Sequence, residues 1–346
     1  TLEKNIVSLF HLDYENYYLN FVVEDASDPA YEKLLDIKEK LSSSSKALKI
    51  DILIAGISDA SSQKIHNLLH SCSNAPDDVE VFAFADSDAC LPAKWLSHLV
   101  HPLRREKHGA STGYRWFVPE RNNLASLALS AMNGKIAQMM GNTGFNLTWG
   151  GSMAIRKEIF YDLELDKNWK TALSDDLCLS RTVKKAGLKI IFVPACLVAT
   201  YEHTTWTELF EFARRQFLIT RITMPGAWAF GTFSSFFSVL GLWGTAGIAL
   251  YAAASQISGL AYYTFVPVLF FCGQLLISSL RQKMVVKLLP ENTKKLKHAL
   301  LADILGNCIW SWILLGCIIA SAFGNTITWR GIKYKLLGPT ETERLN

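Results

Sequence analysis

The sequence lacks charged residues over two long stretches. Between Ile222 and Leu280, and again between Ile304 and Trp329, there is no Asp, Glu, Lys, Arg or His. A helix needs roughly 20 apolar residues to cross the core of a bilayer, and buried helices of soluble proteins are rarely uncharged for so long. The first stretch is long enough for two spans and the second for one, so we expect about three transmembrane spans.

Cysteine patterning and a start signal are also missing. The seven cysteines show no C-x-x-C spacing, which argues against a zinc site or a disulfide framework and favours a role as small apolar side chains. There is no signal peptide, and the first residue is Thr1 rather than Met. We therefore expect the sequence to begin inside a longer protein.

Basic residues cluster beside the apolar stretches, within a modest net charge of +4. Such clusters usually lie on the cytoplasmic side of a membrane. The rest of the sequence has no patch that combines basic and aromatic residues, so we do not expect nucleic acid as a partner. Three full spans would put the last cluster on the far side, so one stretch is expected to be interfacial or re-entrant. The clustered residues are Arg281, Lys283, Lys287, Lys294, Lys295 and Lys297, followed by Arg330, Lys333 and Lys335.

The first 200 residues alternate between strand-like and helix-like segments. This alternation predicts an α/β domain with a mostly parallel sheet, in which ligands bind beyond the carboxyl ends of the strands. The predicted strands are Leu19–Val23, Ile50–Ala55, Val79–Ala85 and Lys189–Val193. The predicted helices are Ala30–Leu41, Ser61–Leu69, Pro92–Leu103, Asn122–Met139 and Ser174–Ala186.

Carboxylates follow two of these strands. Asp25 comes after the first, and Asp86 and Asp88 come after the strand that ends near Ala85. Side chains two residues apart in an extended segment point the same way. Asp86 and Asp88 could therefore hold Mg²⁺ or Mn²⁺ while phosphate oxygens fill the remaining positions. A D-x-D triplet also arises by chance in a solvated turn, but its place after an apolar strand favours the metal site.

Three further motifs have both a functional and a structural interpretation. Asp175 and Asp176 open a helix, where acidic residues are common caps, but a carboxylate beside a donor sugar can also be a general base. Gly150 and Gly151 form an ordinary turn or allow close backbone approach to a ligand. The third motif is Arg214-Arg215-Gln216, on an amphipathic helix expected over residues 203–221. Its arginines can bind a diphosphate or reach lipid headgroups.

The order of these motifs carries a resemblance that no single motif carries. From Asp25 to the spans, the chain resembles the inverting membrane glycosyltransferases of the GT-A fold. It is most similar to the ceramide glucosyltransferases and their bacterial relatives. The segments with the closer match are Phe21–Ala30, the K-x-x-N-L segment Lys64–Leu68 and the tryptophan-arginine ending Thr328–Leu336.

The resemblance implies a Rossmann-like nucleotide-sugar domain followed by transmembrane helices. It implies that Asp25 contacts the nucleotide, that Asp86 and Asp88 hold a divalent cation and the diphosphate, and that Asp176, beside Asp175, is the catalytic base. The other residues that it assigns to the nucleotide-sugar site are Lys64, Asp86, Gly150, Gly151, Arg214, Arg215 and Gln216.

We expect a GT-A catalytic domain over residues 1–202 without its first strand, an interfacial helix over 203–221, a transmembrane region over 222–336 and a tail over 337–346. Some positions depart from the family. Gln216 ends the helix motif where the family's Q/R-x-x-R-W signature has Trp, Ala60 replaces a loop glycine, and Asp175 replaces Glu.

The implied activity is transfer of a hexose, first of all glucose from UDP-glucose, with inversion onto a lipid hydroxyl such as that of ceramide. The catalytic domain would face the cytosol at a bacterial inner membrane or a Golgi or ER membrane. Alternatives within enzymes are a processive polysaccharide synthase, which needs a pore of more spans, and transfer to a polyprenyl phosphate. A non-catalytic membrane scaffold is the alternative from another class.

Overall fold

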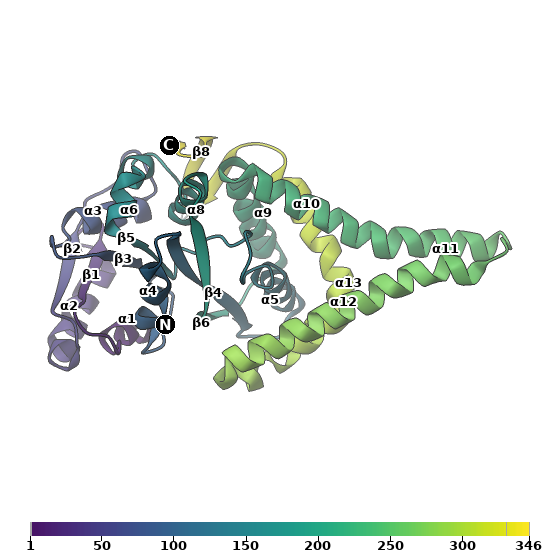
Figure 1. Cartoon of the computed structure of the whole chain (residues 1–346), viewed down its shortest axis with the longest axis horizontal. Coiled ribbons are helices and arrows are strands. Elements are labelled where there is room, and N and C mark those ends of the chain that lie inside the picture. The colour runs from purple at the N-terminus through teal and green to yellow at the C-terminus, as the bar shows by residue number, and fades with distance from the viewer. Residues whose placement is uncertain (1, 330, 346) are drawn as a thin grey trace. The chain divides into compact units, whose positions relative to one another are not determined.

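The computed structural model describes residues 2–329 and 331–345 (Figure 1). The chain forms two compact units. The sheet unit comprises Thr1–Arg115, Met139–Thr200 and Asn325–Asn346. The helical unit comprises Trp116–Gln138 and Tyr201–Gly324. Arg330, part of the C-terminal segment that carries the family resemblance, lies outside the described residues.

The sheet unit contains the alternating helices and strands expected from the sequence. The predicted strands appear within a few residues of their expected bounds, except that the last extends to Glu202. In chain order the elements are α1 (Leu2–Phe10), β1 (Tyr18–Val23), α2 (Pro29–Leu41), β2 (Lys49–Ile54), α3 (Gln63–Ser73), β3 (Val81–Phe84), α4 (Trp95–Val100), β4 (His108–Pro119), β5 (Met153–Arg156), α6 (Lys157–Asp162), α7 (Leu165–Trp169), α8 (Asp175–Lys185) and β6 (Lys189–Glu202).

The strand pairing differs from the expected, mostly parallel sheet. β1 and β2 do pair in parallel, but the four-stranded sheet has the order β3-β5-β4-β6, and β5 is antiparallel to both β3 and β4. The sequence did not reveal β4 or β5. β5 has only four residues, and β4 is buried on both faces, so neither shows alternation. Gly113 in β4 is needed because a Cβ there would lie 2.5 Å from Ser152 Oγ.

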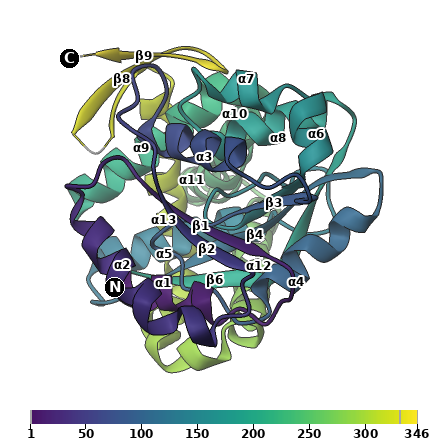
Figure 2. The same ribbon diagram turned by 90° about the vertical axis from the view of Figure 1, so that its left-hand side faces the viewer.

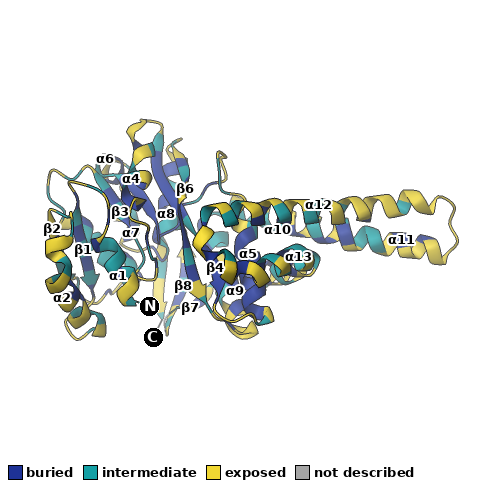
Figure 3. Ribbon diagram, turned by 90° about the horizontal axis from the view of Figure 1, so that it is seen from below, coloured by how far each residue is buried: buried dark blue, intermediate teal, exposed yellow. Residues whose placement is uncertain are grey.

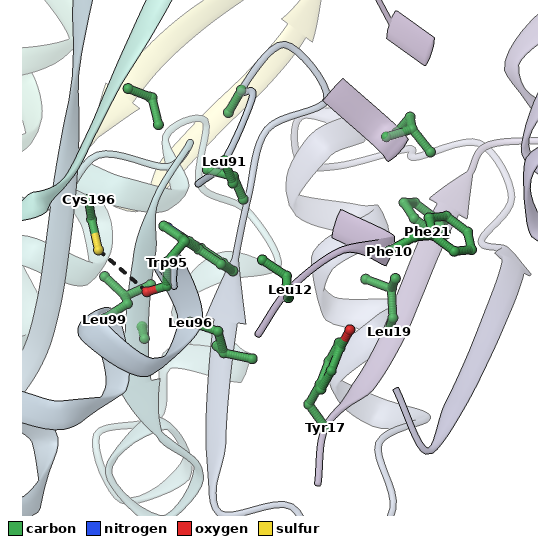
Figure 4. Packing of buried hydrophobic residues seen from close by; sticks show 14 of the residues in the cluster. Phe10, Leu12, Tyr17, Leu19, Phe21, Leu91, Trp95, Leu96, Leu99 and Cys196 are labelled. Carbon is green, nitrogen blue, oxygen red and sulfur yellow. Dashed lines mark hydrogen bonds between the residues drawn. The ribbon is translucent and has the colours of Figure 1, made fainter. Parts of the chain in front are cut away.

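The core of the sheet unit joins α1, β1 and α4 (Figure 4). Phe10 and Phe21 stack with their ring centroids 5.6 Å apart. Buried Trp95 donates from Nε1 to Ser152 Oγ at 2.8 Å, and its carbonyl accepts from the thiol of Cys196 at 3.5 Å. Pairing of the buried polar atoms in this way avoids the cost of leaving them unsatisfied, and it fixes the strands whose ends carry the candidate site.

A C-terminal antiparallel sheet belongs to the sheet unit and was not expected. It consists of β7 (Thr326–Trp329), β8 (Ile332–Gly338) and β9 (Glu341–Leu345). Ile327, Tyr334 and Leu336 are buried in it. The expected continuation of a transmembrane region to residue 336, followed by a tail, is therefore replaced by strands that start at Thr326. The sequence did not predict β7 because it is short and lies at the end of an uncharged, apolar stretch.

The helical unit contains long apolar helices whose surfaces are largely exposed in α11 and α12 (Figure 3). Within residues 2–329 and 331–345, three helices are long and apolar enough to cross a membrane, namely Pro225–Ala254, Leu260–Leu288 and Pro290–Ser321. The elements are α5 (Leu124–Ala137), α9 (Trp206–Thr223), α10 (Pro225–Val239), a π-helical turn (Leu240–Gly244), α11 (Thr245–Ala254), α12 (Leu260–Leu288) and α13 (Thr293–Ser321).

The amphipathic helix expected before the apolar stretches is α9. It begins with a capping box, in which the Thr205 hydroxyl accepts from the Glu208 backbone N–H and the Glu208 carboxylate accepts from the Thr205 N–H. This reciprocal pairing satisfies two otherwise unpaired donors and fixes where the helix starts. The hydrophobic residues Leu209 and Ala213 on its buried side pack with α5 and α13.

Candidate active site

The structure brings together three of the predicted site residues in one charged cluster. Lys64 Nζ, in the first turn of α3, lies 2.6 Å from Asp86 Oδ1 after β3 and 3.0 Å from Asp175 Oδ2 at the start of α8. The Asp175 side chain is only 4% exposed, whereas those of Lys64 and Asp86 are 29% and 24% exposed. The cluster is therefore open on the Asp86 side and closed on the Asp175 side.

Burial and mutual attraction set the charges in this cluster. Burial raises the pKa of Asp175 to about 6, against the opposing pull of the Lys64 ammonium. Burial also disfavours the charge on Lys64, but Asp175, Asp86 and Asp176 outweigh it and raise the pKa of Lys64 above its usual range. Lys64 is thus a fixed cation beside Asp86 and Asp175, because nearby carboxylates favour the charged form of an ammonium group.

Gly150 allows the side chains of Lys64 and Asp175 to approach each other. A Cβ at Gly150 would lie 2.5 Å from Asp175 Oδ2 and closer still to Lys64 Nζ. A Cβ at neighbouring Gly151 would overlap the indole ring of Trp149. The glycine pair therefore allows other side chains of the protein to approach the backbone closely, and its approach to a ligand stays a prediction.

Asp176 points to a different set of partners from Asp175. Its Oδ2 accepts from the Gly150 N–H at 3.2 Å, and its Oδ1 accepts from the Ser174 hydroxyl at 2.5 Å and the Leu177 N–H at 2.7 Å. Asp176 is half-buried, while Asp175 is buried. The adjacent carboxylates therefore occupy distinct environments, one paired with a lysine and one held by neutral donors.

The acidic pair Asp86 and Asp88 lies beyond the end of β3, as the sequence predicted. Asp86 is half-buried and Asp88 is exposed. Among the described residues there is no group of three or more His, Cys, Asp or Glu side chains arranged to hold a metal. Carboxylate oxygens suit Mg²⁺ or Mn²⁺, so the pair fits a cation that arrives with a diphosphate and takes its other ligands from phosphate and water.

Asp25 lies in the loop after β1, also as predicted. Hydrogen bonds from Ser27 hold the pKa of Asp25 below its usual value. One of them is the Ser27 backbone N–H, 2.5 Å from Asp25 Oδ1. Among the residues that the structure describes, no hydrogen bond or ion pair joins Asp25 to Lys64, Asp86 or Asp175. Its ionised, solvent-facing carboxylate can accept hydrogen bonds from a ribose or a base.

Sequence reasoning missed the side chains that shape the loop before α3. Gln63 accepts from the Ser58 N–H at 2.8 Å and donates to the Gly56 carbonyl at 2.8 Å. Gln63 also donates to Asn67, which reaches the Val22 carbonyl at the end of β1. Asn67 is the Asn of the K-x-x-N-L segment, so that motif contained a signal for this role.

Arg214, Arg215 and Gln216 lie on α9 in the helical unit. Arg214 Nη2 donates to the Phe323 carbonyl at 3.0 Å, and Arg221 donates to the carbonyls of Ala322 and Gly324. The guanidinium of Arg215 lies 5.6 Å from the Phe212 ring centroid, and Gln216 is exposed. Arg214 therefore binds a carbonyl that follows the end of α13, and a contact with diphosphate stays a prediction.

The comparison with known families decides the class. The sequence model of the family described as "Glycosyl transferase family 21" matches residues 1–341. The chain belongs to this glycosyltransferase family. Membership, together with the α/β sheet unit and the apolar helices, confirms the predicted GT-A-type domain followed by candidate membrane helices.

Other comparisons add less to this family 21 assignment. A search of curated proteins finds no match. One solved structure that is similar is described as "Crystal structure of GalNAc-T7 with UDP, GalNAc and Mn2+". It shares 14% identity, with a TM-score of 0.37, over 58% of this chain and 44% of the other. The match thus spans less than half of that chain.

Proposed function

We propose that this family 21 chain transfers glucose from UDP-glucose, with inversion, onto a hydroxyl group of a membrane lipid such as ceramide. The observation that carries the proposal is the pair of adjacent carboxylates in different environments. Asp175 is paired with Lys64, whereas Asp176 is half-buried and held by neutral donors. The exposed apolar helices support a lipid rather than a soluble acceptor.

Asp176 is the proposed general base. Its three hydrogen bonds come from groups that orient the carboxylate but do not neutralise it. The acceptor hydroxyl gives its proton to Asp176 while its oxygen bonds to the anomeric carbon. The bond from that carbon to the diphosphate oxygen breaks on the opposite face, and the nucleoside diphosphate leaves with the bonding electron pair. A base positioned in this way contributes typically 10²–10⁴-fold to the rate.

Lys64, Asp86 and Asp88 are proposed to hold the diphosphate. A divalent cation bound at Asp86 and Asp88 would supply charge stabilisation for the leaving group. The Lys64 ammonium is already held close to Asp86 and can turn one N–H toward a phosphate oxygen. Asp25 is proposed to hold the nucleoside. The catalytic domain is proposed to face the cytosol, where its basic flanking segments would meet anionic lipid.

The test is transfer of labelled glucose from UDP-glucose to ceramide by the chain in nanodiscs. We expect a single labelled sugar in the organic phase, loss of transfer with EDTA, and loss in Asp88→Ala. Full activity in EDTA or in Asp88→Ala would remove the metal from the proposal. Label in a long water-soluble polymer would favour a processive synthase, and no transfer from any UDP-sugar would favour a scaffold.

Asp176→Asn and Asp175→Asn separate the roles of the two carboxylates. Asp176→Asn should lower kcat by roughly 10²–10⁴-fold and leave UDP affinity close to that of the parent, because the amide keeps its shape but cannot take the proton. Asp175→Asn should be milder in kcat and should weaken UDP binding, because it loosens Lys64. The reverse order of severity in kcat would show that Asp175 is the base.

A further inference from the structure

The two ends of the helical run return to one compact unit. The sheet unit contains both the strands that precede the apolar helices and the C-terminal sheet that follows them. Arg344 Nη1 on β9 donates to the Ser58 carbonyl at 2.9 Å. The Thr171 hydroxyl, before α8, donates to the Thr340 carbonyl at 2.6 Å. Figure 2 shows β8 and β9 at the same edge of the sheet unit as α3.

The return of the chain to the sheet unit limits the number of membrane crossings. Segments that hydrogen-bond to each other within one folded unit lie on the same side of a bilayer. A chain that leaves that side and returns to it crosses the bilayer an even number of times. The three apolar helices, Pro225–Ala254, Leu260–Leu288 and Pro290–Ser321, are all long enough to cross. They therefore cannot all do so, and at least one of them must stay on the side of the sheet unit.

α13 has the features of the helix that does not cross. Its first turns carry Lys294, Lys295 and Lys297, and farther along it holds Asp303. It packs against α5 and α9. Lys135 on α5 donates to Ser311 Oγ of α13 at 2.8 Å. Charged and polar groups at these positions are costly in contact with lipid, so α13 is better matched to a place against the other helices.

α10, α11 and the part of α12 before Arg281 contain no charged residue. The first candidate span has 30 residues and the second 29. At 1.5 Å per residue each is about 45 Å long, longer than the roughly 30 Å hydrocarbon core. Large apolar side chains such as Phe233, Leu250 and Phe265 are exposed on them. The two helices touch where the Phe270 ring covers Gly241, a close approach that small residues allow in membranes.

We propose that α10–α11 and α12 form a two-pass membrane hairpin, with the turn Ser255–Gly259 on the far side, while α13 stays on the side of the sheet unit. The turn contains no charged residue. The clustered basic residues then share one side, which the distribution of Lys and Arg assigns to the cytosol. These residues are Arg281, Lys283, Lys287, Lys294, Lys295, Lys297, Lys333 and Lys335.

Labelling of single cysteines with a membrane-impermeant maleimide tests the proposal. The background replaces Cys90, Cys272 and Cys308 by serine, because the other four cysteines are buried. The reporters are Ser44→Cys in the sheet unit, Ser258→Cys in the turn and Lys333→Cys in β8, all at exposed positions. Each is expressed in the full chain and labelled in sealed vesicles of both orientations. The readout does not depend on sugar transfer, so it stands apart from the proposed activity.

We expect Ser44→Cys and Lys333→Cys to be labelled in the same vesicle orientation and Ser258→Cys in the other. Labelling of Lys333→Cys from the side opposite to Ser44→Cys would show that α13 crosses, and it would overturn the proposal. Labelling of Ser258→Cys from the side of Ser44→Cys, or from neither side, would overturn the two-pass hairpin. Ser258→Cys labelled after detergent addition confirms that the turn is reactive once exposed.

Discussion

At the scale of single residues, Gly150 controls how closely Lys64 approaches Asp175. Gly150→Ala would force a Cβ into the space of the Lys64 ammonium and the Asp175 carboxylate. We expect kcat/KM to fall by roughly 10²-fold, because displacement by about an ångström commonly costs that much at an active site. The measurement is transfer from UDP-glucose, with the thermal midpoint recorded in parallel.

Gly144→Ala is the matched control for this substitution. A Cβ at Gly144 meets nothing within 4 Å, so activity should stay close to that of the parent. Equal losses in both variants would mean that the Gly150 result reflects general disturbance of the segment. Parent activity in Gly150→Ala would show that the Lys64–Asp175 pair is not needed.

The sequence predicted Lys64, Asp86 and Asp175 as site residues, but it could not predict their contacts. Lys64 precedes Asp175 by more than a hundred positions, and their pairing depends on where α3 and α8 begin. Those starts are set by Ser62 and Ser174, whose hydroxyls cap the two helices. The difference between Asp175 and Asp176 likewise arises from tertiary burial, which a pair of adjacent identical residues does not reveal.

At the scale of elements, a buried ion pair joins α12 to α13. Arg281 Nη2 lies 2.6 Å from Asp303 Oδ1, both side chains are 1% exposed, and Gln282 also donates to Asp303. Asp303→Ala should destabilise the helical unit by about 3–5 kcal/mol, because it leaves a buried charge without its partner. The measurement is the thermal midpoint and denaturant stability of the protein in detergent.

The double variant Arg281→Met with Asp303→Leu should recover much of this loss, because apolar residues of similar volume replace a buried pair at little cost. Glu343→Gln is the exposed control. Its carboxylate lies 3.9 Å from Lys335 in a surface pair, and such pairs contribute about 0–1 kcal/mol. A loss of stability in Asp303→Ala as small as that in Glu343→Gln would show that the Arg281–Asp303 pair does not stabilise the packing of α12 on α13.

Elements with strong patterns were predictable, and elements defined by their neighbours were not. The charge-free stretches predicted the apolar helices. Short apolar segments that alternate with helical segments predicted β1, β2 and β3. β5 has four residues, and β7 has four at the end of an uncharged stretch. Neither is long enough to show a period. They form strands because β3, β4 and β8 offer edges to pair with, which is information that lies elsewhere in the chain.

At the scale of the whole molecule, a glycosyltransferase with a membrane hairpin is suited to an acceptor that partitions into the bilayer. A lipid gains about 0.8 kcal/mol for each CH₂ that it buries there. That free energy corresponds to roughly a fourfold change in effective affinity per CH₂, since about 1.4 kcal/mol is tenfold. The acceptor's chain length should therefore act on its local concentration at the membrane and leave the chemical step unchanged.

The corresponding prediction is that shortening the ceramide acyl chain raises the apparent KM for the acceptor and changes kcat little. The effect should be steepest for short chains that leave the bilayer, and it should disappear once every acceptor in the series is fully membrane-bound. Kinetics in nanodiscs, with acceptor concentration expressed per lipid as well as per volume, separate the two cases. A kcat that falls with chain length at constant KM would mean that the acyl chain is read by protein contacts formed in the transition state. A soluble hydroxylated acceptor with the same kcat/KM as ceramide would remove the bilayer from the mechanism.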